Sequence, residues 1–272
     1  MIRKRYIDTR HGQIHIRESG RGGVPLICLH ATAYSSRSFI ALMAAFGEAR
    51  HVIAIDAPGY GDSDPPTQRP DMAGYADTIA AAIAGTVGAE TPFDLFGYHT
   101  GVAIAAELAI VTPHMERRMV WLGVPYFHAL DFEAWRARLA RGHTLGADLG
   151  QFDERWDYLV TGRPAGISLE RGFTNFVDEL KAWPNGSWAH QALFDWNIEA
   201  RLPLVTQTTL ILNPESHLAE PSRVAARLMP NATVIELPHL SGAVLETAAT
   251  EIAALTAAFL DQLQTAQQKS AA

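Results

Sequence analysis

The sequence predicts an α/β fold, a doubly wound and mostly parallel sheet of about eight strands with helices on both faces. Short apolar segments alternate along the chain with segments that carry apolar residues at helical spacing. The short segments are apolar throughout, which is typical of parallel strands buried on both faces. No repeat of fixed length runs through the sequence, which excludes solenoids and propellers.

The same alternation gives the order of the expected elements. Buried strands are expected at residues 24–29, 52–56, 93–97, 119–124, 208–213 and 233–237. Helices are expected at residues 38–46, 72–88, 100–111, 221–228 and 243–263. Residues 5–18 alternate apolar and polar side chains, which predicts an antiparallel edge hairpin that turns at His11 and Gly12.

One long segment, residues 127–202, interrupts this alternation. It contains five of the six tryptophans, and its apolar residues follow a helical pattern. We interpret it as a helical cap inserted into a core made of residues 1–126 and 203–272. Caps of this kind cover the catalytic edge of a sheet and shape the pocket beneath it. Trp188 and His190 are the cap residues that we expect to reach that pocket.

Composition limits the class of protein. The 272 residues are 48% hydrophobic and 19% charged, as in an ordinary globular protein. The net charge of −7 disfavours nucleic acid as a partner, and the single cysteine, Cys28, excludes an internal disulfide. The N-terminus lacks the apolar stretch of a signal peptide, and no segment approaches the ~20 residues of a membrane span. We therefore expect a cytoplasmic monomer or homodimer that acts on a small molecule, away from membranes.

Two turn motifs follow predicted strands. The first is Leu29-His30-Ala31-Thr32, and the second runs from Asp56 through Pro58-Gly59-Tyr60-Gly61 to Ser63. The glycines of the second motif permit a tight reversal, and we expect Asp56 and Ser63 to bond that loop.

The third motif is Gly97-Tyr98-His99-Thr100-Gly101, between a predicted strand and an alanine-rich predicted helix. Small residues two positions before and after a central residue allow a sharp strand-to-helix turn. His99 is the central residue. A residue at such a turn points away from the core, and Thr100 offers a backbone N–H at the start of the helix.

The fourth segment comprises two C-terminal loops. Pro214-Glu215-Ser216-His217 leads to Pro221 after one predicted strand, and Pro238-His239-Leu240-Ser241-Gly242 follows the last one. Three of these loop residues, Glu215, His217 and His239, can carry charge or protons.

In order and spacing, the four segments resemble the α/β-hydrolase superfamily. The resemblance implies that His99 stands where the fold usually carries a nucleophilic serine, and that the N–H groups near Thr32 and Thr100 form the oxyanion hole. It places His217 at the position of the triad acid, with Glu215 two residues earlier. It places Ser241 or Gly242 at the position of the triad histidine, with His239 two or three residues earlier.

A Ser-His-Asp mechanism is therefore not expected, because none of the three positions carries the usual residue type. We expect an enzyme in which His99 is the nucleophile or general base and hydrolyses an ester, thioester or C–C bond of a small apolar substrate. His217 or His239 would relay protons, and Glu215 would stabilise an imidazolium. No cofactor is expected. His30, Tyr34, Tyr98, Ser241, Trp188 and His190 are candidate pocket residues.

Two alternatives stay open. His99, His217 and His239 come from loops at one edge of the sheet and could hold a zinc or iron ion. The chain could also be a catalytically degenerate homologue that only binds a ligand. The remaining histidines are expected at the surface or in the cap: His11, His15, His51, His114, His128 and His143.

Overall fold

A computed structural model describes residues 1–127, 133, 137 and 146–262 of the chain. Its centre is one eight-stranded sheet in the order β1-β2-β4-β3-β5-β6-β7-β8. The strands are β1 (Arg3–Thr9), β2 (Gly12–Ser19), β3 (Leu26–Leu29), β4 (Val52–Ile55), β5 (Phe93–Tyr98), β6 (Glu116–Leu122), β7 (Thr208–Glu215) and β8 (Ala232–Ser241). From β4 to β8 in that order all pairs are parallel, whereas β1 and β2 form the antiparallel edge hairpin. This architecture confirms the predicted fold class.

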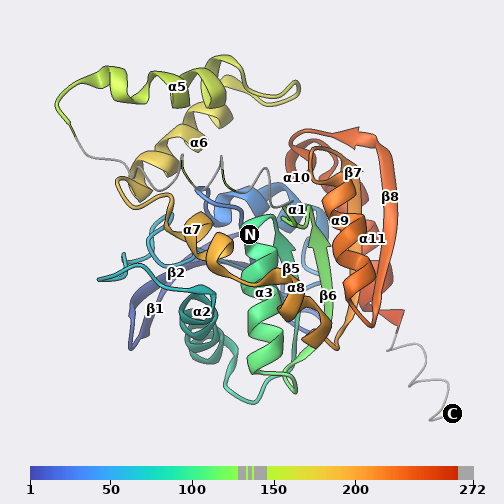
Figure 1. Cartoon of the computed structure of the whole chain (residues 1–272). Helices are drawn as coiled ribbons and strands as arrows, with labels where there is room; N and C mark the ends of the chain where they lie inside the picture. The colour runs from blue at the N-terminus through green and yellow to red at the C-terminus, as the bar shows by residue number, and fades with distance from the viewer. Residues whose placement is uncertain (128–132, 134–136, 138–145, 263–272) are drawn as a thin grey trace, which may run out of the picture.

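Helices cover both faces of the sheet (Figure 1). The helices of the core are α1 (Ile40–Phe46), α2 (Met72–Val87), α3 (Thr100–Val111), α9 (Ala219–Leu228), α10 (Val244–Thr247) and α11 (Ala249–Leu260), with a short helix η1 (Ser36–Phe39) before α1. The expected helix at 243–263 is divided in two at Ala248. No helix in the described part of the chain has the length and apolar character needed to cross a membrane.

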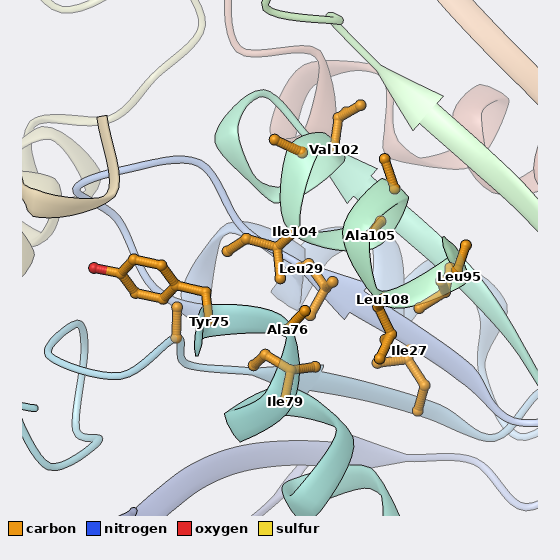
Figure 2. Packing of buried hydrophobic residues seen from close by; sticks show 14 of the residues in the cluster. Ile27, Leu29, Tyr75, Ala76, Ile79, Leu95, Val102, Ile104, Ala105 and Leu108 are labelled. Atoms are coloured by element: carbon orange, nitrogen blue, oxygen red, sulfur yellow. The ribbon is translucent and has the colours of Figure 1, made fainter. Parts of the chain in front are cut away.

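Successive residues of the central strands belong to two different apolar clusters. In β3, Ile27 and Leu29 pack with α2 and α3, as Figure 2 shows, whereas Leu26 and Cys28 pack with α1 and α11. All four side chains are buried. A strand buried on both faces has no polar positions, which explains why these segments read as continuous apolar runs.

Between β6 and β7 the described residues form helices and no strand. They are η2 (Leu149–Phe152), α5 (Asp153–Trp156), η3 (Asp157–Thr161), α6 (Leu169–Ala182), α7 (Trp188–Asp195), α8 (Ile198–Arg201) and η4 (Leu202–Leu204). We call these the inserted helices. In Figure 1, α5 and α6 project from the body of the fold. Much of the first part of the expected cap lies outside the described residues, and a separate cap unit stays a prediction.

The last two strands are longer than the sequence predicts. Strand β8 was expected to end at 237 but continues to Ser241, and β7 continues to Glu215. The reason is their mutual pairing, which runs through Asn213↔Glu236 and, after an irregularity, ends at Glu215↔Ser241. Pro214, Glu215 and Ser241, which were expected in two loops, therefore pair across the two strands.

Candidate active site

His99 occupies a sharp turn between β5 and α3. It is the one non-glycine residue of the described chain with positive φ, at 50°. Its N–H donates to the Leu122 carbonyl at 3.0 Å, and its carbonyl accepts from the N–H of Val102 at 2.8 Å. The strained backbone is thus held on both sides, as strained residues at functional sites generally are.

The two glycines of the motif make this turn sterically feasible. A Cβ atom at Gly101 would lie 2.1 Å from the Leu29 carbonyl oxygen, and one at Gly97 would lie 2.8 Å from the Cα of Val102. Helix α3 therefore approaches the ends of β3 and β5 more closely than any larger residue permits.

The imidazole of His99 lies against the backbone of the residue that follows β6. A Cβ atom built on Gly123 would stand 2.7 Å from Cδ2 and 2.9 Å from Nε2 of His99. The same point is 3.3 Å from Cδ1 of Leu218. The Tyr98 ring lies on another side, with its centroid 4.3 Å from that of His99. Gly123 and Tyr98 thus fix where the imidazole can sit.

Two more histidines lie near His99. His217, in the exposed turn after β7, meets it edge-on with ring centroids 6.3 Å apart at 87°. His190, on the inserted helix α7, is close enough for its charge to influence His99. The described residues form no hydrogen bond to a ring nitrogen of His99 or His190. None of these ring nitrogens is counted among the described buried polar atoms that lack a hydrogen-bond partner. These nitrogens are therefore open to a ligand or to water.

Burial, with the charges of His217 and His190 acting in the same direction, lowers the pKa of His99 to about 3. Burial, together with the charge of Arg155, also lowers the pKa of His190 to about 4. Among the described residues no carboxylate raises the pKa of His99. Both imidazoles are therefore neutral at physiological pH.

The expected oxyanion donors follow paired strands. Leu29 of β3 lies opposite Gly97 of β5, so Thr32 and Thr100 each come three residues after one member of that pair. Thr100 is buried at the first position of α3, where backbone N–H groups have no acceptor within the helix. This arrangement fits the predicted role of Thr100.

Three predicted partners of His99, namely His239, Glu215 and Ser241, belong to the last two strands. His239 is on the exposed side of β8, where its Nε2 lies 2.8 Å from Oε1 of Glu251 on α11. Glu215 and Ser241 are paired with each other and exposed at the ends of their strands. Neither His239 nor Glu215 is among the groups that shift the pKa of His99, and their roles as proton relay and stabilising carboxylate stay predictions.

His30, a candidate pocket residue, has both ring nitrogens bonded within the fold. It is buried, its Nδ1 lies 2.9 Å from the Ala31 carbonyl oxygen, and its Nε2 accepts from the Ala57 N–H at 2.9 Å. Both ring nitrogens are occupied, so His30 joins two loops, and its place in the pocket stays a prediction. Burial lowers its pKa, which agrees with a neutral ring.

His15 was expected at the surface but is buried beside Asp56. Its Nδ1 lies 2.7 Å from Oδ2 of Asp56, and that oxygen also accepts from the Asp62 N–H at 2.9 Å, while Oδ1 of Asp56 accepts from the Ser36 N–H at 2.6 Å. Burial alone would raise the pKa of Asp56, but these hydrogen bonds hold it at about 2. As predicted, Ser63 bonds the same loop, donating to the Asp56 carbonyl at 2.8 Å.

The predicted three-histidine metal site is not assembled. Within the described residues, the one cluster with metal-like spacing is His15, Asp56 and Asp62, whose ligand atoms lie within 4.8 Å of one another. Those atoms are already bonded to each other, to backbone N–H groups and to Lys181. His99, His217 and His239 form no such cluster there. His128 and His143 lie outside the described residues.

The inserted helices are tied to the core beside the site. The Tyr60 hydroxyl donates to the Gly186 carbonyl at 3.1 Å and accepts from the Ala189 N–H at 3.0 Å. Arg171 of α6 contacts Glu246 of α10 through two nitrogens, at 2.8 and 3.0 Å. The Tyr60 bonds hold α7, and with it His190 and the half-buried Trp188, next to the core, and the Arg171 bonds do the same for α6.

Comparison with known proteins identifies one matching family and several similar proteins. A family model described as the alpha/beta hydrolase family matches residues 26–255. The 2-(acetamidomethylene)succinate hydrolase of Mesorhizobium japonicum is 28% identical over 245 residues, which are 86% of each chain. A crystal structure of E-2-(acetamidomethylene)succinate hydrolase superposes with a TM-score of 0.74 at 22% identity, covering 96% of this chain and all of that one. A putative lipase of Acinetobacter baumannii superposes at 0.80 with 16% identity, covering 97% and 92% of the two chains.

Proposed function

The chain belongs to the alpha/beta hydrolase family, and we propose that it hydrolyses an ester or thioester of a small apolar molecule with His99 as nucleophile. The observation that carries this proposal is the position of a neutral, open imidazole on the strained turn after β5. An imidazole of low pKa is a weak base and a good leaving group. It therefore suits activated acyl groups better than plain amides.

In the first step, a neutral ring nitrogen of His99 attacks the acyl carbon and forms a carbon–nitrogen bond. The negative charge that develops on the carbonyl oxygen meets the N–H groups near Thr32 and Thr100. The alcohol or thiol then leaves, and the proton that it needs comes from the imidazole or from water. The product of this step is an acyl-imidazole.

In the second step, water attacks the acyl-imidazole, one of its protons passes by way of His217 or His190 to the departing ring nitrogen of His99, and the carbon–nitrogen bond breaks to release the acid. His99 returns to its neutral form, and no metal or cofactor takes part in the proposed reaction. For a substrate cleaved at a C–C bond, the same imidazole would act as a general base toward water.

The first test is hydrolysis of p-nitrophenyl butyrate by the wild type and by His99→Ala. General-base or nucleophilic work by one residue accounts for about 10²- to 10⁴-fold of rate, so the variant should lose that much kcat/KM. Mass spectrometry of the acid-quenched reaction should find the acyl group on the peptide that contains His99. Full activity in His99→Ala would exclude this role, and inhibition by a chelator would favour the metal alternative.

A ligand-binding homologue without activity is the second candidate. One observation favours it, namely that no carboxylate of the described residues supports the charge that a protonated His99 would carry. For this candidate, folded wild-type protein would bind apolar esters without releasing their products. Equal ester binding by wild type and His99→Ala, with no turnover in either, would support it.

A further inference from the structure

A groove of about 550 Å³ lies on the inserted helices α5, η3 and α6, of which α5 and α6 project from the body of the fold (Figure 1). Its lining residues are Trp156, Val160, Leu169, Glu170 and Phe173. None of them is among the described residues that contact the ring of His99. Pockets for small ligands have volumes of about 300–1,000 Å³ and mainly apolar walls with a few polar groups. This groove has the size and the lining of such a pocket.

Two aromatic side chains of the groove are held in place by ring contacts. Trp156 meets Phe173 edge-on, with centroids 6.1 Å apart at 79°, and meets the buried Phe176 at 5.4 Å and 87°. Phe176 and Val160 belong to one small apolar cluster, against which Tyr34 packs from the core. Trp156 and Phe173 nevertheless remain 37% and 49% exposed. Their rings are therefore fixed and still offer surface to a ligand.

The polar member of the lining is the carboxylate of Glu170. It is exposed in the first turn of α6, and within the described part of the chain no hydrogen bond or ion pair engages it. The adjacent Arg171 contacts Glu246 of α10 and does not neutralise it. A carboxylate without a counter-ion beside exposed aromatic rings suits a positively charged group.

The other charges near the groove have the same preference. Arg155 is paired with both oxygens of Glu179. Arg163, which has no carboxylate partner among the described residues, donates to two backbone carbonyl groups at 2.8 and 2.9 Å. Asp153 and Asp157 add negative charge at the starts of α5 and η3. Negative charge therefore predominates around the groove and disfavours an anionic ligand.

We propose that this groove binds a small amphiphilic amine, with its apolar part against Trp156, Leu169 and Phe173 and its ammonium group beside Glu170. A cation is attracted to the face of an aromatic ring, most strongly to that of tryptophan. A neutral ligand would use the apolar walls alone, and an anion would be repelled by Glu170. The site lies apart from His99, so binding requires no turnover and does not depend on the proposed hydrolysis.

The test compares three probes that carry a phenyl group at the end of a four-carbon chain. Phenylbutylamine is protonated at neutral pH, phenylbutanol is uncharged, and phenylbutyrate is negative. Their dissociation constants for the full chain are measured by ligand-observed NMR at low ionic strength. The amine should bind about 3- to 30-fold more tightly than the alcohol, because an exposed cation–π contact and an exposed ion pair each contribute a few-fold. Phenylbutyrate should bind most weakly.

Four variants at exposed positions assign the binding to the groove. Glu170→Gln keeps the shape of the side chain and should weaken binding of the amine about 2- to 5-fold, with the alcohol unaffected. Phe173→Leu keeps an apolar wall without the ring and should lower the preference for the amine by a similar factor. Leu169→Ala should weaken binding of both probes. Glu90→Gln, the matched control on the core, should behave as wild type.

The proposal is overturned if the amine binds no better than the alcohol, if phenylbutyrate binds most tightly, or if the wild type binds none of the probes. It is also overturned if neither Glu170→Gln nor Phe173→Leu changes the preference. Sedimentation with phosphatidylcholine vesicles that Glu170→Gln abolishes would overturn it in favour of a lipid headgroup.

Repeating the measurements in His99→Ala separates this site from the proposed hydrolysis. A preference for the amine that survives in this variant supports the groove whether or not the wild type hydrolyses esters. Loss of that preference together with His99 would place the amine at the turn after β5 and overturn the proposal.

Discussion

Two groups of histidines in this chain have opposite surroundings. The core histidines, His15 and His30, are buried and bonded to Asp56 and to the backbone of neighbouring loops. The site histidines, His99, His190 and His217, lie near one another and have no carboxylate partner in the described chain. A bonded imidazole joins parts of the fold, whereas an open one is available for chemistry. The comparison shows that the environment of a histidine, and not its presence in a motif, decides its role.

The largest expected effect is a loss of stability when the bonds of a core histidine are removed. Asp56→Ala removes the carboxylate that supports buried His15 and two backbone N–H groups. Breaking a buried pair in this way costs about 3–5 kcal/mol. Urea unfolding should show this loss, whereas His99→Ala should change the free energy of unfolding far less. Similar losses in the two variants would remove the distinction between the groups.

The second prediction concerns the pH profile of ester hydrolysis. Since the pKa of His99 is about 3, the ring stays neutral and kcat/KM should stay level down to pH about 5. A histidine with the ordinary pKa of about 6.5 would lose roughly 30-fold there. A fall centred near pH 6.5 would show that a carboxylate or solvent supports His99 after all.

The same pKa predicts how stability changes with acid. Between pH about 6.5 and about 3, the unfolded chain binds a proton at His99 that the folded chain does not. Stability should therefore fall as the pH is lowered through this window. His99→Ala should flatten the fall, and an unchanged slope in the variant would contradict the assignment. Asp56 acts at lower pH, because its stabilisation is lost from about 4 down to about 2.

The fourth prediction uses two glycines with similar backbone angles. Gly123 and Gly23 have φ of +71° and +69°, so alanine costs each a similar strain of roughly 1–2 kcal/mol. A methyl group at Gly123 meets the His99 ring, whereas one at Gly23 has no described residue within 4 Å apart from its two neighbours in the chain. Gly123→Ala should lower kcat/KM by about tenfold or more, since displacement of a reacting group by an ångström costs up to 10²-fold. Gly23→Ala should keep wild-type kinetics, and equal rates in both variants would mean that the ring position is unimportant.

The smallest effect on stability and activity is expected for the substitution of His239. Its ion pair with Glu251 is exposed, with 59% and 42% of the two side chains accessible. Such pairs contribute about 0–1 kcal/mol. His239→Ala should therefore keep both stability and ester hydrolysis close to wild type. A loss of activity as large as that of His99→Ala would restore the relay role that the sequence suggested.

The sequence predicted the fold well because burial leaves a local record. Strands enclosed on both faces, such as β3, must be apolar at every position, and the glycines at 97 and 101 mark a turn that larger residues would prevent. The position of His99 in that turn follows from these neighbours. None of this depends on which distant segments meet.

The partners of His99 could not be predicted in the same way. Whether β8 ends at 237 or at Ser241 depends on how far β7 pairs with it, which no local pattern of residues 238–241 reveals. The burial of His15 likewise depends on Asp56, which is 41 residues away in the chain. The surroundings of His239, Glu215 and His30, which the sequence did not predict, have the same cause.

By itself, the sequence determined the sheet, the turn and the residue at its centre, because these depend on short-range sterics and on burial. Only the tertiary structure decided which histidines are bonded and which are open. It placed His190 of an inserted helix near His99 and paired His239 with Glu251 at the surface. The physical reason is that the charge state of an imidazole is set by groups within a few ångströms, and in this fold those groups come from segments far apart in the chain.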